Sequence, residues 1–340
     1  MKVLFIGGTG NISTACVERA LAKGHEVTVL NRGSHNEGLD PRVRVIVGDR
    51  HDGALLERVA REDRYDVVAN FVGYTPDQVA LDVAAFSGQV GQYLFISTAS
   101  AYQRPPNHYV ITESTPLRNP YWEYARLKIA CEDLLVRAYR ERGFPITIVR
   151  PSYTYGPTWI PCSVGGHAYT VVHRMRQGLP IVCQGDGQGL WVLTHNSDFA
   201  VGLVGLFGAQ QAIGEAFHIT SDEALTWEAI YRTMGRAAGC QEIEIVYVPM
   251  QTIAALYPEL GPGLLGDKGY SVVFDNSKIK RVVPEFRAVV PFAEGIARSI
   301  AWADADPAKR HIVNDKVNAM MDGLIRAQRS VMGPAQGVGE

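Results

Sequence analysis

The sequence has few cysteines, little net charge and no long apolar run. Its five cysteines do not form a C-x-x-C pair and have no histidine nearby at metal-ligand spacing. This scatter argues against a zinc site and against a disulfide framework, so we expect no metal and reduced thiols. The cysteines are Cys16, Cys131, Cys162, Cys183 and Cys240.

The charges are nearly balanced. The chain has 33 Lys and Arg residues and 35 Asp and Glu residues, which gives a formal net charge of −2 with both signs dispersed. A surface that binds nucleic acid or an anionic membrane needs an excess of positive charge. We therefore expect neither nucleic acid nor a membrane as a partner.

No uninterrupted apolar stretch approaches the roughly 20 residues that span a bilayer. The first residues, MKVLFIGG, lack the pattern of a signal peptide and indicate a short strand followed by a glycine turn. The default expectation is a cytoplasmic protein. With 340 residues, of which 46% are hydrophobic, the chain has room for about two domains.

The first half of the chain alternates between two hydrophobic periods. Short, β-branched apolar runs have the composition of strands buried on both faces. The segments between these runs, such as 14–24 and 122–143, have helical spacing and end at a glycine. This order predicts an α/β fold with a Rossmann-like, doubly wound parallel sheet. The expected strands are 2–6, 26–30, 43–47, 66–71, 92–96 and 146–150.

The second half predicts a smaller C-terminal substrate-binding lobe, because its helical and strand-like pieces are shorter and separated by turn-rich segments. We expect residues 1–156 to form the dinucleotide-binding domain, to which 196–225 return as a helix and a strand. The lobe is expected to comprise 157–195 and 226–330. The last residues, 331–340, are expected to be disordered.

The segment IGGTGNIS follows the first expected strand and opens the first expected helix. In such a loop, Gly7 and Gly10 let the backbone approach a pyrophosphate at the helix N-terminus. Asn11 and Ile12 belong to the same loop and are expected to contact the cofactor. Ser13 stands where a third glycine is usual, and a small residue suffices there because the position needs only close helix packing.

The end of the second expected strand has the sequence VLNRG. It places Asn31 and Arg32 where NAD sites usually carry an acid for the ribose 2′-hydroxyl. An arginine suits a 2′-phosphate, so the expected cofactor is NAD or NADP, with NADP slightly favoured. Alternatively, Arg32 stacks on adenine or is solvated. Asp49, after the third strand, is placed to accept a hydrogen bond from the adenine amino group.

Tyr124 and Lys128 lie four residues apart on a long expected helix, so both side chains project from one face. An ammonium and an oxidised nicotinamide ring nearby would stabilise the phenolate and move the tyrosine pKa, normally about 10, toward neutrality. Tyr124 would then exchange a proton with a substrate hydroxyl while a hydride moves to or from the nicotinamide. A surface tyrosine and lysine are the alternative. The segment ISTASAY, which supplies hydroxyls at the carboxyl edge of the sheet, argues against that alternative.

These segments together resemble the extended short-chain dehydrogenases/reductases of the NAD-dependent epimerase/dehydratase family. The resemblance implies Thr98, Tyr124 and Lys128 as the catalytic triad, with Ser97 and Ser100 as weaker candidates for the first role. It rests on GGTGNIS, GDRHD, FISTASAY, TESTPLRNPYWEYARLK, IVRPSYTYGP and GDGQGLWVLTHNSDFA, which extend to about residue 220.

The resemblance also implies contacts with the cofactor and with a second subunit. Lys128 is expected to bind the nicotinamide ribose hydroxyls. The backbone from Pro151 to Tyr153 is expected to border the nicotinamide. Members of the family commonly pair through the helix that carries the tyrosine and the lysine, so we expect a homodimer.

Two departures from the family pattern narrow the reaction. Family members that dehydrate sugars have an Asp-Glu pair after the threonine, because loss of water needs an extra acid and base. Here those positions are Ala99 and Ser100. Nucleotide-sugar members often have arginines for the diphosphate, whereas this chain has Trp191 at one such place and no arginine in GPGLLGDKGY. Dehydration and a nucleotide-diphosphate sugar are therefore not favoured.

Four residues are candidate substrate contacts. Tyr74 follows the fourth strand, Tyr153 follows the sixth, and His167 lies on a glycine-flanked segment. Trp191 suits stacking on a sugar face or a base, although core packing explains a single tryptophan equally well. His195 is expected to order its own loop.

The sequence thus favours an NAD(P)-dependent epimerase. It would oxidise a secondary alcohol of a sugar-like substrate to a transient ketone and reduce the ketone from its other face. A dehydrogenase or reductase acting on a sugar or nucleoside-like substrate would use the same residues. The alternative from another class is a non-catalytic or RNA-binding relative, against which the Tyr124–Lys128 pair and the near-zero net charge argue.

Overall fold

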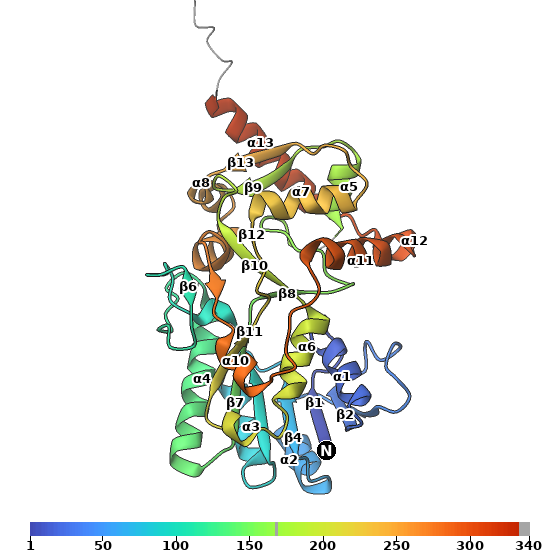
Figure 1. Cartoon of the computed structure of the whole chain (residues 1–340), viewed down its shortest axis with the longest axis vertical. Helices are drawn as coiled ribbons and strands as arrows, with labels where there is room; N and C mark the ends of the chain where they lie inside the picture. The colour runs from blue at the N-terminus through green and yellow to red at the C-terminus, as the bar shows by residue number, and fades with distance from the viewer. Residues whose placement is uncertain (167–168, 333–340) are drawn as a thin grey trace, which may run out of the picture.

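Two lobes, stacked along the long axis, make up the computed structural model, which describes residues 1–166 and 169–332 (Figure 1). We call them the sheet lobe, built around a seven-stranded sheet, and the small lobe, built from short strands and helices. The sheet lobe lies at the bottom of Figure 1 and contains the N-terminus.

All neighbouring strands of the seven-stranded sheet are parallel, in the order β11-β7-β5-β4-β1-β2-β3. The predicted doubly wound α/β fold is therefore confirmed. The strands are β1 (Lys2–Ile6), β2 (Glu26–Asn31), β3 (Arg44–Val47), β4 (Val67–Asn70), β5 (Gln92–Ile96), β7 (Ile146–Pro151) and β11 (Ala216–Ile219).

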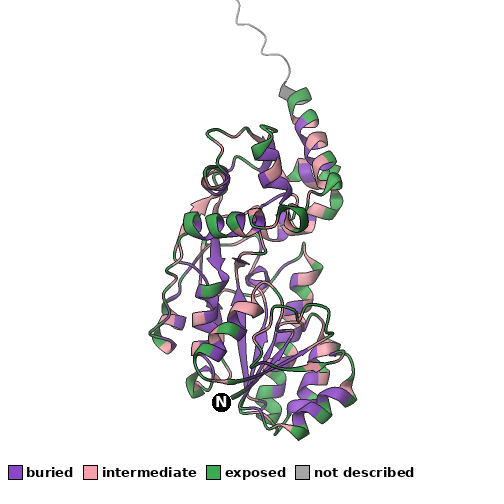
Figure 2. Cartoon of the chain, turned by 90° about the vertical axis from the view of Figure 1, so that its right-hand side faces the viewer, coloured by how far each residue is buried: buried purple, intermediate pink, exposed green. Residues whose placement is uncertain are grey.

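Helices cover both faces of this sheet, which is why its central strands are apolar throughout. On β1, Val3 and Phe5 pack with α1, α6 and α10, whereas Leu4 and Ile6 pack with α2, α3 and α4. Figure 2 shows the buried strands between helices whose outer faces are exposed. The helices are α1 (Ser13–Ala22), α2 (Gly53–Glu62), α3 (Pro76–Phe86), α4 (Glu123–Arg142), α6 (Asn196–Gly205) and α10 (Ser277–Val282).

One strand differs from its prediction. Segment 43–47 was expected to be buried on both faces, but β3 is the edge strand of the sheet. Val45 and Val47 are 37% and 66% exposed, since β3 pairs with β2 on one side and no other described strand pairs with it. β-Branched composition alone does not distinguish an edge strand from a central one.

The strand order reverses between β1 and β4, where the chain crosses from one half of the sheet to the other. Ile6 at the end of β1 lies opposite Leu30 of β2 and Asn70 of β4. The loops that leave these strands diverge there and open a crevice, which is the usual ligand site of such sheets.

The small lobe has its own core around Trp191, Trp227 and Tyr231. Its strands are β8 (Tyr153–Tyr155), β10 (Leu190–His195) and β12 (Ala224–Thr226) in one sheet, the pair β9 (Ile181–Gln184) and β13 (Ile245–Val248), and the pair β6 (Val110–Ile111) and β14 (Val273–Phe274). Its helices are α5 (Thr170–Arg176), α7 (Trp227–Ala237), α8 (Met250–Leu256), α9 (Gly261–Gly263), α11 (Phe292–Asp304), α12 (Pro307–Arg310) and α13 (Asp315–Met332). Single turns are η1 (Ala99–Ala101), η2 (Gln210–Ala212), η3 (Pro258–Leu260) and η4 (Leu264–Lys268).

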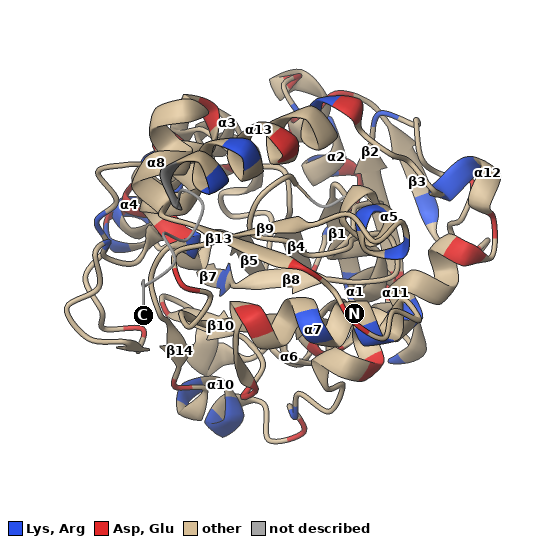
Figure 3. Cartoon of the chain, turned by 90° about the horizontal axis from the view of Figure 1, so that it is seen from above, with Lys and Arg blue, Asp and Glu red and all other residues tan. Residues whose placement is uncertain are grey.

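Charged residues of both signs are interspersed over the helices and loops of the described residues (Figure 3). No helix among those residues is both long and apolar enough to cross a membrane. Within the same part of the chain, no cluster of His, Cys, Asp and Glu has the arrangement of a metal site.

Candidate active site

A cleft of about 1660 Å³ opens at the carboxyl ends of the sheet strands, between the two lobes. It lies at the reversal of strand order, where α/β sheets bind ligands. Every predicted site residue that the structure describes lines this one cleft. The remaining predicted site residue, His167, lies outside the described residues.

The glycine loop forms one wall of the cleft. Gly7 has a φ of +84°, and a Cβ added there would lie 2.6 Å from Cγ1 of Val72. Only glycine therefore fits, and the bare backbone leaves room for a pyrophosphate at the N-terminus of α1. The loop thus fits the dinucleotide that the sequence predicts.

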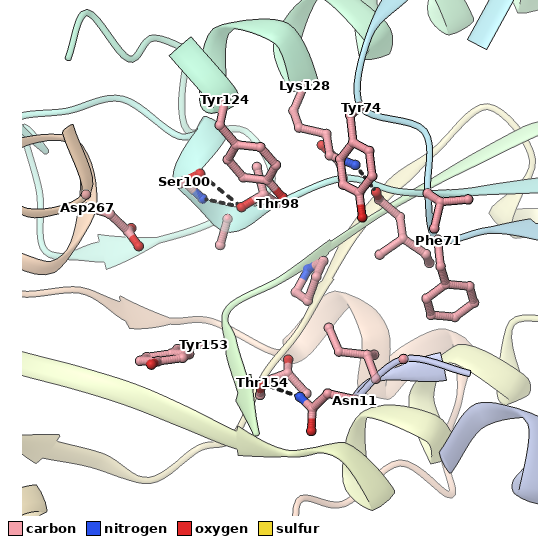
Figure 4. Close-up of a pocket in the computed structure, with 18 of the residues that line it drawn as sticks. Asn11, Phe71, Tyr74, Thr98, Ser100, Tyr124, Lys128, Tyr153, Thr154 and Asp267 are labelled. Carbon is pink, nitrogen blue, oxygen red and sulfur yellow. Dashed lines mark hydrogen bonds between the residues drawn. The ribbon is translucent and has the colours of Figure 1, made fainter. Parts of the chain in front are cut away.

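Ser13 has a structural use that sequence reasoning missed. Its buried hydroxyl accepts a hydrogen bond from the Gly10 N–H at 2.8 Å. The serine therefore closes the turn into α1 in addition to allowing close packing. Asn11 donates from Nδ2 to the Thr154 carbonyl at 3.1 Å, which links the loop to β8 (Figure 4). Ile12 lines the cleft beside it.

The residues predicted to contact adenosine also line the cleft. The Asn31 side chain is engaged locally, since Nδ2 donates to Asn36 at 2.6 Å and Oδ1 accepts from the Gly33 N–H at 2.9 Å. Arg32 is exposed at the rim. Hydrogen bonds from His51 lower the pKa of Asp49, so this carboxylate is ionised and able to accept.

Lys128 lines the cleft but is almost fully buried. Its Nζ donates to the carbonyl oxygens of Gly73 and Ile96, both at 2.7 Å, and so ties α4 to the ends of β4 and β5. Burial lowers the pKa of Lys128 to about 8. The rings of Phe95, Tyr74 and Tyr124 surround the ammonium at 4.7, 5.0 and 5.9 Å from Nζ to the ring centroids.

Tyr124 points into the cleft from the first turn of α4, close to Thr98 (Figure 4). Burial raises the pKa of Tyr124 to about 12, while the Thr98 hydroxyl acts in the opposite direction. The chain alone therefore does not produce the shift toward neutrality that the sequence predicts with an oxidised nicotinamide present. A cation bound in the cleft would favour the phenolate.

The three hydroxyl candidates after β5 differ in their surroundings. Thr98 shares a hydrogen bond of 2.9 Å with Ser100, and both line the cleft near Tyr124 (Figure 4). Ser97 instead donates to the buried carboxylate of Glu132 at 2.5 Å. This geometry favours Thr98 for the first role of the triad, with Ser100 beside it.

The candidate substrate contacts are not equivalent. Tyr74 is 46% exposed and lies over Lys128 at the cleft. The Tyr153 hydroxyl accepts from the Cys162 N–H at 3.2 Å, so its ring is held in place. Trp191 is only 3% exposed and stacks on Trp227 at 5.4 Å between ring centroids, so packing accounts for most of its surface. Pro151 borders the cleft at the end of β7.

Sequence reasoning missed several charged residues that line the cleft, among them Arg104, Asp267 and Lys268. Arg104 donates to the Asp267 carboxylate at 3.2 Å. Asp267 and Lys268 belong to GPGLLGDKGY, a segment considered only for its lack of arginine. No periodicity or motif marks Arg104, which lies far from that segment in the sequence.

Comparison with known proteins adds to this geometry. The family model "NAD dependent epimerase/dehydratase family" matches residues 3–219. A dTDP-glucose 4,6-dehydratase of Actinoplanes is 29% identical over 340 residues, which cover 90% of this chain and 98% of that protein. A chloroplast stem-loop binding protein of 41 kDa from Arabidopsis thaliana is 25% identical over 72% of this chain and 65% of its own length.

The fold has close counterparts among solved structures. The UDP-glucose 4-epimerase of Thermotoga maritima superposes with a TM-score of 0.74 at 19% identity, over 90% of this chain and all of that chain. At this identity the likeness establishes the fold. Together with the family match, it shows that the chain belongs to the NAD-dependent epimerase/dehydratase family and is an enzyme of the short-chain dehydrogenase/reductase type.

Proposed function

We propose that the protein is an NAD(P)-dependent epimerase that acts on a secondary alcohol of a sugar-like substrate through a transient ketone. The observation that supports this most directly is that Thr98, Tyr124 and Lys128 converge in the same cleft as the Gly7 loop. A bound nicotinamide dinucleotide supplies the hydride acceptor and donor.

In this mechanism the chain's own residues transfer one proton from the substrate to the protein and later back. The Tyr124 phenolate accepts the proton of the substrate hydroxyl and returns it to the alkoxide formed when the ketone is reduced. The Thr98 hydroxyl orients the substrate oxygen and the phenol. Lys128 places a positive charge below the ring of Tyr124 and so favours the phenolate.

Dehydration is less favoured because Ala99 and Ser100 occupy the places of the Asp-Glu pair. A dehydrogenase or reductase would use the same residues. It would differ from an epimerase in that its cofactor leaves after each turnover. A stem-loop binding role, which the Arabidopsis relative's name describes, has less support because positive charge is not concentrated on the described surface.

The finer properties are proposals of the same kind. NADP is slightly favoured over NAD because Arg32 at the rim suits a 2′-phosphate. A homodimer through α4 is supported by the position of this helix on the outside of the sheet lobe (Figure 1). We also propose a cytoplasmic location, because free thiols, as at all five cysteines, are typical of a reducing compartment.

The test is to denature the purified protein and to identify any released nucleotide by chromatography and mass. We expect close to one NAD or NADP per chain, because an epimerase regenerates its cofactor within the site. An empty protein that binds one form reversibly would favour the reductase. A protein that binds neither would contradict both.

A pair of glycine variants controls this measurement. Gly7→Ala should abolish nucleotide retention, because its Cβ would lie 2.6 Å from Val72 at a φ of +84°. Gly24→Ala is the matched control, since Gly24 also has a positive φ (+78°) but nothing lies within 4 Å of its added Cβ and it does not line the cleft.

A further inference from the structure

The segment after β3, which carries Asp49, is tied to the first turn of α3. Arg50 is almost fully buried, and its Nη2 donates to the Gln78 carbonyl at 2.9 Å and to the Asp82 carboxylate at 2.7 Å. His51 reaches the same turn from the exposed side, since its Nε2 lies 2.9 Å from Nε2 of Gln78. One buried residue and one exposed residue therefore hold the segment against α3.

The hydrogen bonds around His51 define how its ring is protonated. Oε1 of Gln78 accepts from the backbone N–H groups of Tyr74 at 2.7 Å and Thr75 at 3.3 Å. The amide nitrogen of Gln78 therefore faces His51 and donates to Nε2 of the ring. Nδ1 of His51 then carries the proton and donates to Asp49 at 2.7 Å. Every donor in this chain of bonds thus meets an acceptor.

The chain of bonds ends at the catalytic side of the cleft. Tyr74 follows Gly73, whose carbonyl accepts from Nζ of Lys128 at 2.7 Å. The Tyr74 ring lies beside the same ammonium, with 5.0 Å from Nζ to the ring centroid (Figure 4). The turn 73–75 is therefore held by Lys128 on one side and by Gln78 on the other.

We propose that His51 and Gln78 are positioning residues that connect the adenosine end of the dinucleotide site to the turn 73–75. This inference rests on the proposed function and adds a coupling within that site. Both bonds between Asp49 and His51 use Oδ1 of the carboxylate, so Oδ2 can accept from the adenine amino group.

The coupling follows from exposure. The Asp49 and His51 side chains are 58% and 60% exposed, so water competes for their hydrogen bonds. An adenine that covers them removes this competition and strengthens the bonds. Bound adenosine should therefore fix Gln78 and, through it, Tyr74. By reciprocity, an alcohol that holds Tyr74 should raise the dinucleotide affinity by the same factor.

The test measures amide hydrogen exchange by mass spectrometry on the full-length protein. The protein is loaded with the dinucleotide that it retains, NAD or NADP, or with the hypoxanthine analogue of that dinucleotide. The analogue replaces the adenine amino group with an oxygen, which cannot donate to Asp49. We expect the amides of Tyr74 and Thr75 to exchange about fivefold or more faster with the analogue, the lower end of usual coupling between sites.

The glycine loop provides the occupancy control. Its amides should exchange equally with both dinucleotides, because both carry the same pyrophosphate. If the amides of Tyr74 and Thr75 also exchanged equally while both dinucleotides were bound, the coupling would be overturned.

Variants assign the effect to His51. His51→Ala should abolish the difference between the two dinucleotides, although the capping box of Thr75 and Gln78 remains. His108→Ala is the matched control and should keep the full difference, because His108 is an exposed histidine outside the cleft. A merely structural role of His51 would speed exchange equally with both dinucleotides. A difference that persisted in His51→Ala would thus refute the proposal.

The two proposals fail in different ways. A protein that bound no dinucleotide would overturn both. Unchanged turnover in Tyr124→Phe would overturn only the proposed function. Exchange at Tyr74 that did not respond to the adenine amino group would overturn only the coupling, whatever the turnover.

Discussion

Tyr124 lies in a setting that by itself opposes ionisation. Burial raises its pKa to about 12, and the Thr98 hydroxyl compensates only in part. Lys128 is also destabilised as a charged group, since burial lowers its pKa to about 8. Two backbone carbonyls nevertheless hold its ammonium near the phenol. The site is thus arranged so that an added positive charge, such as that of an oxidised nicotinamide, has a large effect.

Removing the Tyr124 hydroxyl should therefore abolish proton transfer. We expect Tyr124→Phe to lower turnover by about 10²- to 10⁴-fold, the usual contribution of a positioned acid–base group. Nucleotide content should stay unchanged, because Gly7 and Lys128 are intact. Steady-state rates on a sugar-like alcohol that the wild-type protein converts, together with released nucleotide, provide the measurement.

Tyr139→Phe provides the control for this prediction. Tyr139 lies on the same helix, is 38% exposed and does not line the cleft. Its variant should keep full turnover. If Tyr124→Phe were equally active, Tyr124 would not be the acid–base group and the redox mechanism would be wrong.

At the scale of elements, one buried carboxylate joins the three segments that form the catalytic end of the cleft. Glu132 lies one turn after Lys128 on α4 and accepts from Ser97 after β5 at 2.5 Å. It also accepts from Arg150 of β7 at 3.0 and 2.5 Å. Both partners of the ion pair are almost fully buried.

Truncation of this carboxylate should destabilise the protein strongly. Glu132→Ala leaves the Arg150 guanidinium buried without its partner, which costs about 3–5 kcal/mol of unfolding free energy. Urea denaturation followed by circular dichroism measures the change. Glu141→Ala, on an exposed position of the same helix, should change the value by less than about 0.5 kcal/mol. Equal stability of the two variants would refute the assigned role of Glu132.

At the scale of the whole molecule, the cleft depends on contacts between its two walls. Asn196, at the start of α6, donates to the Asn11 carbonyl at 2.7 Å, and Asn11 donates to Thr154 at 3.1 Å. The glycine loop, β8 and α6 are therefore connected before any ligand binds. A dinucleotide that contacts the loop should stabilise both lobes together.

Dinucleotide binding should thus raise the stability of the folded chain. At a free concentration about 100 times the dissociation constant, the free energy of unfolding should increase by about 2.7 kcal/mol. Thermal unfolding of nucleotide-free protein, with NAD and NADP added separately, measures the shift and ranks the two forms. The Gly7→Ala variant should show no shift. If neither NAD nor NADP changed the thermal unfolding of the wild-type protein, the proposed cofactor site would be wrong.

The sequence by itself determined the features that depend on near neighbours. The alternation of apolar β-branched runs with helical segments specified the parallel sheet. Each central strand of such a sheet is covered by helices on both faces and is therefore apolar throughout. The positive φ of Gly7 and the four-residue spacing of Tyr124 and Lys128 are likewise local properties. Tertiary structure alone decided the exposure of β3, since an edge is defined by what does not pack on it.

Tertiary structure also decided the substrate end of the cleft. Arg104 and Asp267 lie more than 160 residues apart in the chain, and only tertiary packing brings them together as an ion pair. Trp191 was an open alternative in the sequence and became a packed residue because Trp227 stacks on it. Burial and charge at these places depend on distant neighbours, which no local pattern encodes.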